Sequence, residues 1–163
     1  MTYHMRRVRQ ALILMKELRF DTPLPWTGDR TLWDWFRGLG VGMNVIMDDS
    51  DNSCCGADRM IRLSVGGATA EPALLGYDVL AMIAGFVHEA RHIEAGAHPC
   101  QGRYDNLISD LGAAGCQNLY SQFMARHSDP AQVPLEYRPR FLWSACVHRE
   151  TFCQEPPRAC ETQ

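Results

Sequence analysis

The residues that decide the fold are 77–95, with the sequence YDVLAMIAGFVHEARHIEA. Apolar side chains such as Val79, Ile83 and Phe86 recur at helical spacing and continue around most of the circumference, which is typical of a buried helix. Gly96 follows directly, and a glycine in this position favours the end of a helix. The stretch therefore predicts a buried helix over residues 77–95.

The rest of the chain shows shorter helical and strand patterns. Apolar spacing predicts helices over residues 4–19, 105–127 and 139–150, a short helix capped by Thr31, and strands over 41–47 and 60–65. The polar stretch between the two strands favours an antiparallel hairpin with a long connection. We therefore expect one α+β domain over residues 1–163. In it, short antiparallel strands pack on the N-terminal helix and the helix over 77–95, and the C-terminal half is helical.

Composition excludes several classes of protein. The chain has 163 residues, of which 46% are hydrophobic and 21% charged, as in an ordinary soluble domain. A net charge of −3 with no long basic run argues against nucleic acid or an anionic membrane as a partner. No feature indicates an oligomeric state. The first apolar run ends at Lys16 and Glu17, which predicts no signal peptide and favours a cytoplasmic location.

Seven cysteines point toward a different compartment. Their number leaves a secreted or periplasmic location open, although the count is odd and no CxxC pair occurs. The adjacent Cys54 and Cys55 and the C-terminal Cys153 and Cys160 are the best candidates for disulfides. The alternative is that the cysteines are buried thiols that pack as small apolar side chains.

Among the polar residues of the apolar helix, His88, Glu89 and His92 have the types and spacing of a metal site. Residues four apart lie on one helix face, so the two imidazoles can both direct a nitrogen at one cation. Glu89 is about 100° further around the helix, where it borders the site and can hold a water molecule without binding the metal. Catalytic zinc sites take three protein ligands as a rule, so one more is expected.

The string from His88 to His92 resembles the zinc-binding HExxH helix of the zincin metallopeptidases. With His98 it becomes HExxHxxxxxH, which is similar to the metzincin pattern HExxHxxGxxH. The metzincin glycine position is occupied here by Ala95, and the glycine comes one residue later. A methionine turn is not evident, because the only downstream methionine, Met124, falls in a predicted helix.

This resemblance implies a small zincin-like fold in which Zn2+ is bound by His88, His92 and His98, with Glu89 as general base on a zinc-bound water. The substrate would be a peptide or protein, held in extended form along the strand over 60–65.

The gluzincin branch instead takes a carboxylate as third ligand, and Asp105 or Asp110 would supply it here. Further candidates are Cys100 as a ligand and Tyr104, Arg103 or His127 as the group that stabilises the oxyanion. The alternative function is a non-catalytic zinc-binding or interaction domain derived from a peptidase.

Overall fold

The computed structural model describes residues 3–46, 59–64, 77–95 and 112–153. Within these ranges the chain is a mixed α+β structure that is mostly helical, as predicted. Its elements are α1 (Tyr3–Glu17), α2 (Leu32–Gly38), β1 (Gly42–Ile46), β2 (Met60–Ser64), α3 (Tyr77–Ala95), α4 (Ala113–Arg126), the 3-10 helix η1 (Leu135–Tyr137) and α5 (Arg138–Cys153). In the described part of the chain, no helix has the combination of length and hydrophobicity that crossing a membrane requires.

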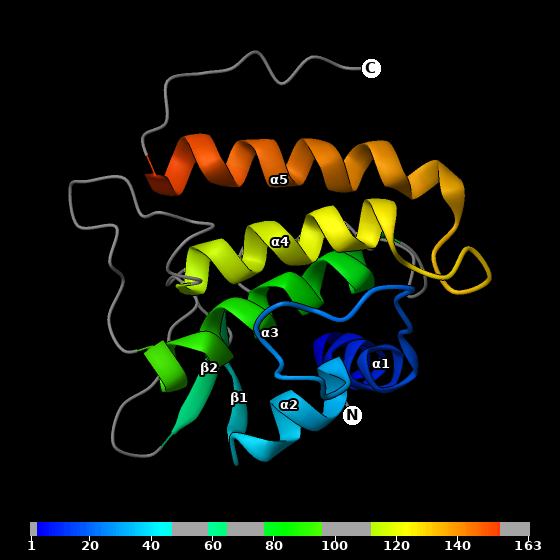
Figure 1. Ribbon diagram of the computed structural model, residues 1–163. Helices are drawn as coiled ribbons and strands as arrows, with labels where there is room; N and C mark the ends of the chain where they lie inside the picture. Colours follow the sequence, from blue (N-terminus) through cyan, green and yellow to red (C-terminus); the bar gives the residue numbers. More distant parts are fainter. Residues whose placement is uncertain (1–2, 47–58, 65–76, 96–111, 154–163) are drawn as a thin grey trace.

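Three helices form successive layers, with α4 packed between α3 and α5 (Figure 1). The N-terminal turn of α4 carries small buried residues, Ala113, Ala114 and Gly115, which allow the neighbouring helices to approach closely. Tyr120 of α4 donates a hydrogen bond to the carbonyl oxygen of Leu80 in α3 at 3.0 Å. Figure 1 shows that these two helices run antiparallel.

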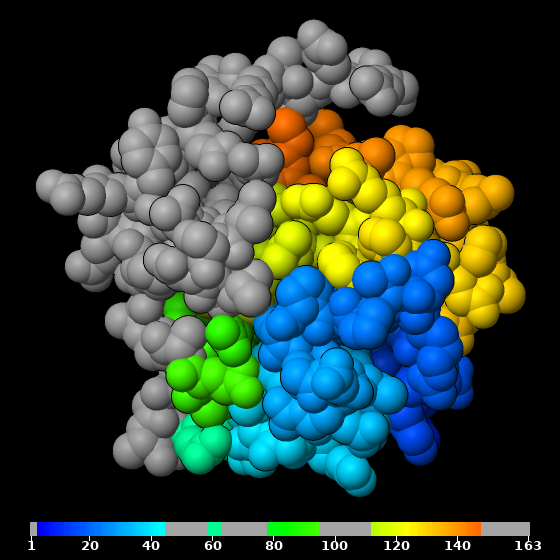
Figure 2. Space-filling view, in the orientation of Figure 1, coloured from blue at the N-terminus to red at the C-terminus, as the bar shows by residue number. Residues whose placement is uncertain are grey.

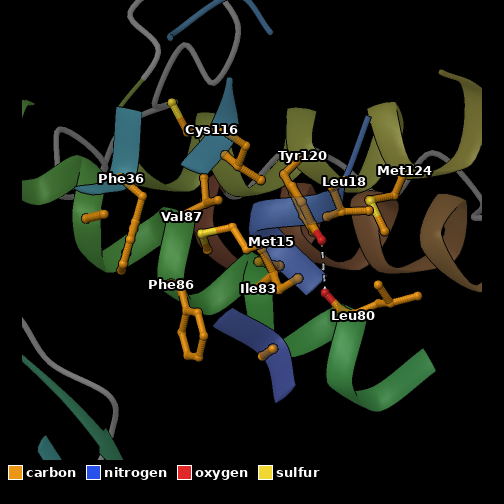
Figure 3. Close-up of a cluster of buried hydrophobic side chains, with 14 of the residues drawn as sticks. Met15, Leu18, Phe36, Leu80, Ile83, Phe86, Val87, Cys116, Tyr120 and Met124 are labelled. Atoms are coloured by element: carbon orange, nitrogen blue, oxygen red, sulfur yellow. Dashed lines mark hydrogen bonds between the residues drawn. The ribbon is translucent and has the colours of Figure 1, made fainter. Parts of the chain in front are cut away.

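The core lies where α1 packs against α3 and α4 (Figure 3). Met15 of α1, Ile83 of α3 and Met124 of α4 are almost completely buried there. Helix α3 has the predicted bounds, and its buried side chains extend around most of its surface. The prediction of a buried helix over these residues is confirmed.

The predicted antiparallel hairpin is wrong, because β1 and β2 pair in parallel. Gly42 lies opposite Met60, and Ile46 lies opposite Ser64. A parallel pair needs a crossover of about a dozen residues or more. The connection over residues 47–59 is long enough for one, and alternation of apolar residues does not depend on strand direction. Beside α3, this sheet presents Ile61 to the core.

Helix α4 begins later than predicted, at Ala113 rather than at Asp105. Gly112 is its N-cap, with an extended backbone (φ −63°, ψ −178°) that cannot belong to a continuous helix. Glycine has a high conformational entropy to lose in a helix, which explains why the helix does not include this position. Residues 105–111 lie outside the described residues.

The cysteines that the structure describes differ in state. Cys146 of α5 is disulfide-bonded, which the sequence did not single out. Cys116 of α4 is a buried thiol that forms no disulfide. Cys54, Cys55 and Cys160 and the side chain of Cys153 lie outside the described residues, so their pairing stays a prediction.

Candidate metal centre

His88, Glu89 and His92 lie in the second half of α3. Only 7% of His88 and 6% of Glu89 is exposed to solvent, whereas His92 is half-buried. The α-helix forms here because the neighbouring residues, including Val87 and Ala90, are fully buried against the core. The helix thus holds polar groups at the border between the core and the solvent.

The two imidazole rings meet, with the Nε2 atom of His88 3.3 Å from the Nε2 atom of His92. The ring centroids are 5.0 Å apart, and the ring planes are inclined by 75°. Nitrogen ligands lie about 2.0–2.1 Å from zinc, so two of them in a tetrahedral shell are about 3.3–3.4 Å apart. The spacing of the pair therefore fits two positions of a tetrahedral zinc ion. A fold in which the rings pointed into different environments would not have this spacing.

Glu89 is a buried carboxyl group beside this pair. Burial removes its solvation and raises the pKa of Glu89 from 4.5 to about 7. A carboxyl group with a pKa near neutrality can both accept and return a proton at physiological pH. Glu89 does not join the two histidines as a third ligand among the described residues. A carboxyl group with this pKa, one residue after His88, is suited to proton transfer.

The third ligand cannot be taken from the described part of the chain. Within residues 3–46, 59–64, 77–95 and 112–153, no group of three His, Cys, Asp or Glu side chains is placed to hold a metal ion. His98 and its alternatives Asp105, Asp110 and Cys100 lie outside the described residues. The predicted third ligand thus stays a prediction.

Glu94 is directed away from the histidine pair. It comes two residues after His92, which places it about 200° further around the helix. Its Oε2 atom accepts a hydrogen bond from Nε1 of Trp35 at 3.0 Å and another from Arg91 at 2.5 Å. The helical spacing disfavours Glu94 as a ligand, but no local pattern indicated its contact with Trp35, 59 residues away.

His127, a predicted oxyanion-stabilising group, lies at the other end of the molecule. It caps the C-terminus of α4 and pairs with Asp21, with 2.8 Å between His127 Nδ1 and Asp21 Oδ1. Since Tyr120 contacts Leu80, His127 is about 20 Å from His88 along the helix axes, at 1.5 Å per residue. His127 is therefore too far from the histidine pair to stabilise an oxyanion there. Tyr104 and Arg103 lie outside the described residues.

Comparisons with known proteins identify no relative of this chain. No protein-family model matches the chain, and neither a curated protein nor a solved structure shows significant similarity to it.

Proposed function

We propose that this chain is a zinc-dependent metallopeptidase that hydrolyses peptide bonds. The proposed ligands are His88, His92 and His98, and the proposed general base is Glu89. The observation that supports this most is the 3.3 Å spacing of the two Nε2 atoms on one face of a buried helix, next to a desolvated carboxyl group. A group that serves only in a structural ion pair needs neither two histidines at metal-ligand spacing nor a desolvated carboxyl group beside them.

When bound, zinc would polarise the scissile carbonyl group and lower the pKa of a water molecule in the site. The ionised carboxylate of Glu89 takes a proton from the attacking water as the oxygen adds to the carbonyl carbon. Glu89, now neutral, returns this proton to the amide nitrogen as the C–N bond breaks. Its raised pKa suits both transfers, because neither protonation state is strongly favoured near pH 7.

The substrate in this proposal is an extended peptide beside β2, the strand that contacts α3. Backbone hydrogen bonds to a strand hold a peptide with little demand on its side chains. The proposal therefore includes a peptide or protein substrate without strong sequence preference.

A non-catalytic zinc-binding domain is the second candidate. The low exposure of both His88 and Glu89 favours it, because a structural zinc ion is enclosed by four protein ligands and needs no access for a substrate. The two functions differ in whether Glu89 takes part in a reaction, so the cleavage of peptides by the zinc-loaded wild type separates them.

The test combines elemental analysis with a peptide-cleavage assay on the full chain. We expect about one zinc ion per chain in the wild type. Glu89→Gln should keep the zinc and lose at least about 100-fold in kcat, because general base catalysis contributes about 100- to 10,000-fold. His92→Ala should lose both zinc and activity.

The matched control is His127→Ala, which removes a histidine about 20 Å from the site and should keep zinc and activity. A wild-type chain that binds no zinc would overturn the proposal. Full zinc binding with no cleavage of any peptide in a mixed library would instead support the non-catalytic domain.

A further inference from the structure

The last turn of α3 is tied to α2 by one carboxylate. Oε2 of Glu94 accepts hydrogen bonds from Nε1 of Trp35, at 3.0 Å, and from Arg91, at 2.5 Å. Nη2 of Arg30, in the segment before α2, lies 4.0 Å from the other carboxylate oxygen. Figure 2 shows the end of α3 (bright green) at the surface next to the residues of α2 (cyan).

The donor that reaches Glu94 is held rigidly. Trp35 is fully buried, and its ring packs edge-on against that of Trp26, with the centroids 6.5 Å apart. The side chain of Thr31 caps α2 by accepting a hydrogen bond from the backbone N–H of Asp34. The indole N–H of Trp35 therefore occupies a defined position. Because Glu94 accepts a hydrogen bond from it, the last turn of α3 is held in one orientation relative to α2.

This turn matters because it contains His92. The last four carbonyl groups of a helix have no partner within it, so the last turn is its least constrained part. If this turn rotated by about 20°, an atom about 6 Å from the helix axis would move by about 2 Å. Metal–ligand distances tolerate only about 0.2 Å. A contact that sets the rotation of this turn therefore sets the position of the His92 ring relative to that of His88.

We infer that Glu94 is a positioning residue for the metal centre, acting through its hydrogen bond from Trp35 on the opposite side of α3 from the histidines. It touches neither metal nor substrate in this inference, which rests on the proposed zinc site. Groups that hydrogen-bond a metal ligand directly change metal affinity by about 10- to 100-fold, so Glu94, which acts through the helix, is expected at the lower end of this range.

The experiment measures zinc affinity by competition with a chromophoric chelator and records the visible absorption spectrum of the cobalt(II)-loaded protein. Glu94→Ala removes the acceptor and should weaken zinc binding about 10-fold and shift the cobalt bands. Glu94→Gln keeps an amide oxygen that can accept from Trp35, so it should restore affinity to within about threefold of the wild type.

Tyr120→Phe is the matched control. It removes one buried hydrogen bond to α3, at Leu80 in the first half of the helix, and should lower thermal stability without changing zinc affinity or the cobalt spectrum. This control separates the positioning of His92 from a general loss of stability.

The outcomes are distinct. If the wild type binds zinc and Glu94→Ala has the same zinc affinity and cobalt spectrum, the positioning role of Glu94 is overturned and the proposed zinc site stands. Equal weakening in Glu94→Ala and Tyr120→Phe would also overturn it, because stability would then explain both. A wild type that binds no zinc would overturn the inference together with the proposed function.

Discussion

Glu89 is an energetically costly residue at its position in α3. Phe86, Val87 and Ala90 of the same helix are apolar and fully buried, and an apolar side chain at position 89 would pack there without a desolvation penalty. Burial instead favours the neutral carboxyl group and raises the pKa of Glu89 to about 7. An ionisable group buried at this cost, one residue after the first of two histidines whose Nε2 atoms meet, is typical of a functional site.

The cost of burying Glu89 predicts how stability depends on pH in the zinc-free protein. The pKa of Glu89 is about 7 in the folded chain and 4.5 for an ordinary solvated glutamate, the value expected in the unfolded chain. The folded state therefore binds the proton more tightly. The resulting stabilisation is complete below pH 4.5, falls as the pH rises from 4.5 to 7, and is lost above pH 7. Glu89→Gln should remove this dependence and make the chain more stable than the wild type at pH 8, by at most about 3 kcal/mol.

Urea denaturation of chelator-treated protein at pH 4.5, 6 and 8 tests this prediction. Identical pH dependence in the wild type and Glu89→Gln would show that the carboxyl group is solvated in the folded chain.

At the scale of elements, α2 depends on its N-cap more than on its length. It has only seven residues, and isolated helices of this length are unstable. The Thr31 hydroxyl oxygen accepts from the backbone N–H of Asp34 at 3.1 Å and donates to the Asp34 carboxylate at 2.8 Å. The sequence predicted the cap at Thr31 but not the return bond to Asp34, and together they fix the start of the helix that carries Trp35.

Thr31→Ala should lower the free energy of unfolding by about 1 kcal/mol, because it leaves one backbone N–H of α2 without its cap. For a chain of this size that loss corresponds to about 2–4 °C in the melting temperature. Thr31→Ser keeps the hydroxyl group and should stay within about 0.5 kcal/mol of the wild type. Thermal unfolding followed by circular dichroism measures both, and equal losses in the two variants would contradict a capping role.

At the scale of the whole molecule, the residues after α1 and those after α4 form a second junction. Phe20 and Ser128 make an isolated antiparallel bridge. His127 hydrogen-bonds the Asp21 carboxylate and holds the pKa of that group below its ordinary value. Gln132 accepts from the backbone N–H of Arg19 at 2.8 Å and donates to the carbonyl of Glu17 at 2.6 Å. One glutamine side chain thus ties the end of α1 to a segment more than 100 residues away.

Gln132→Ala should lower the free energy of unfolding by about 1–2 kcal/mol, through the loss of two hydrogen bonds that are open to solvent. Amide exchange at Arg19 should accelerate more than exchange in α3. Gln132→Glu keeps the acceptor for Arg19 and loses the donor to Glu17, so exchange at Arg19 should stay slower than in Gln132→Ala. Unchanged exchange at Arg19 in both variants would show that the junction does not depend on this side chain.

The sequence predicted local features where one element contains all the interacting residues. The bounds of α3, the cap at Thr31 and the meeting of His88 with His92 all depend on contacts between residues three or four apart. Helical periodicity is sufficient for such contacts, because the helix geometry itself brings the residues together.

Only the tertiary structure decided how the elements meet. Alternating apolar residues predicted both strands, yet the alternation is the same in either direction and could not show that β1 and β2 are parallel. The hydrogen bond from Trp35 to Glu94 and the ties between Gln132 and the end of α1 join residues 59 to 115 positions apart. Such partners are chosen by the packing of whole helices around a shared core, for which a single sequence contains no local signal.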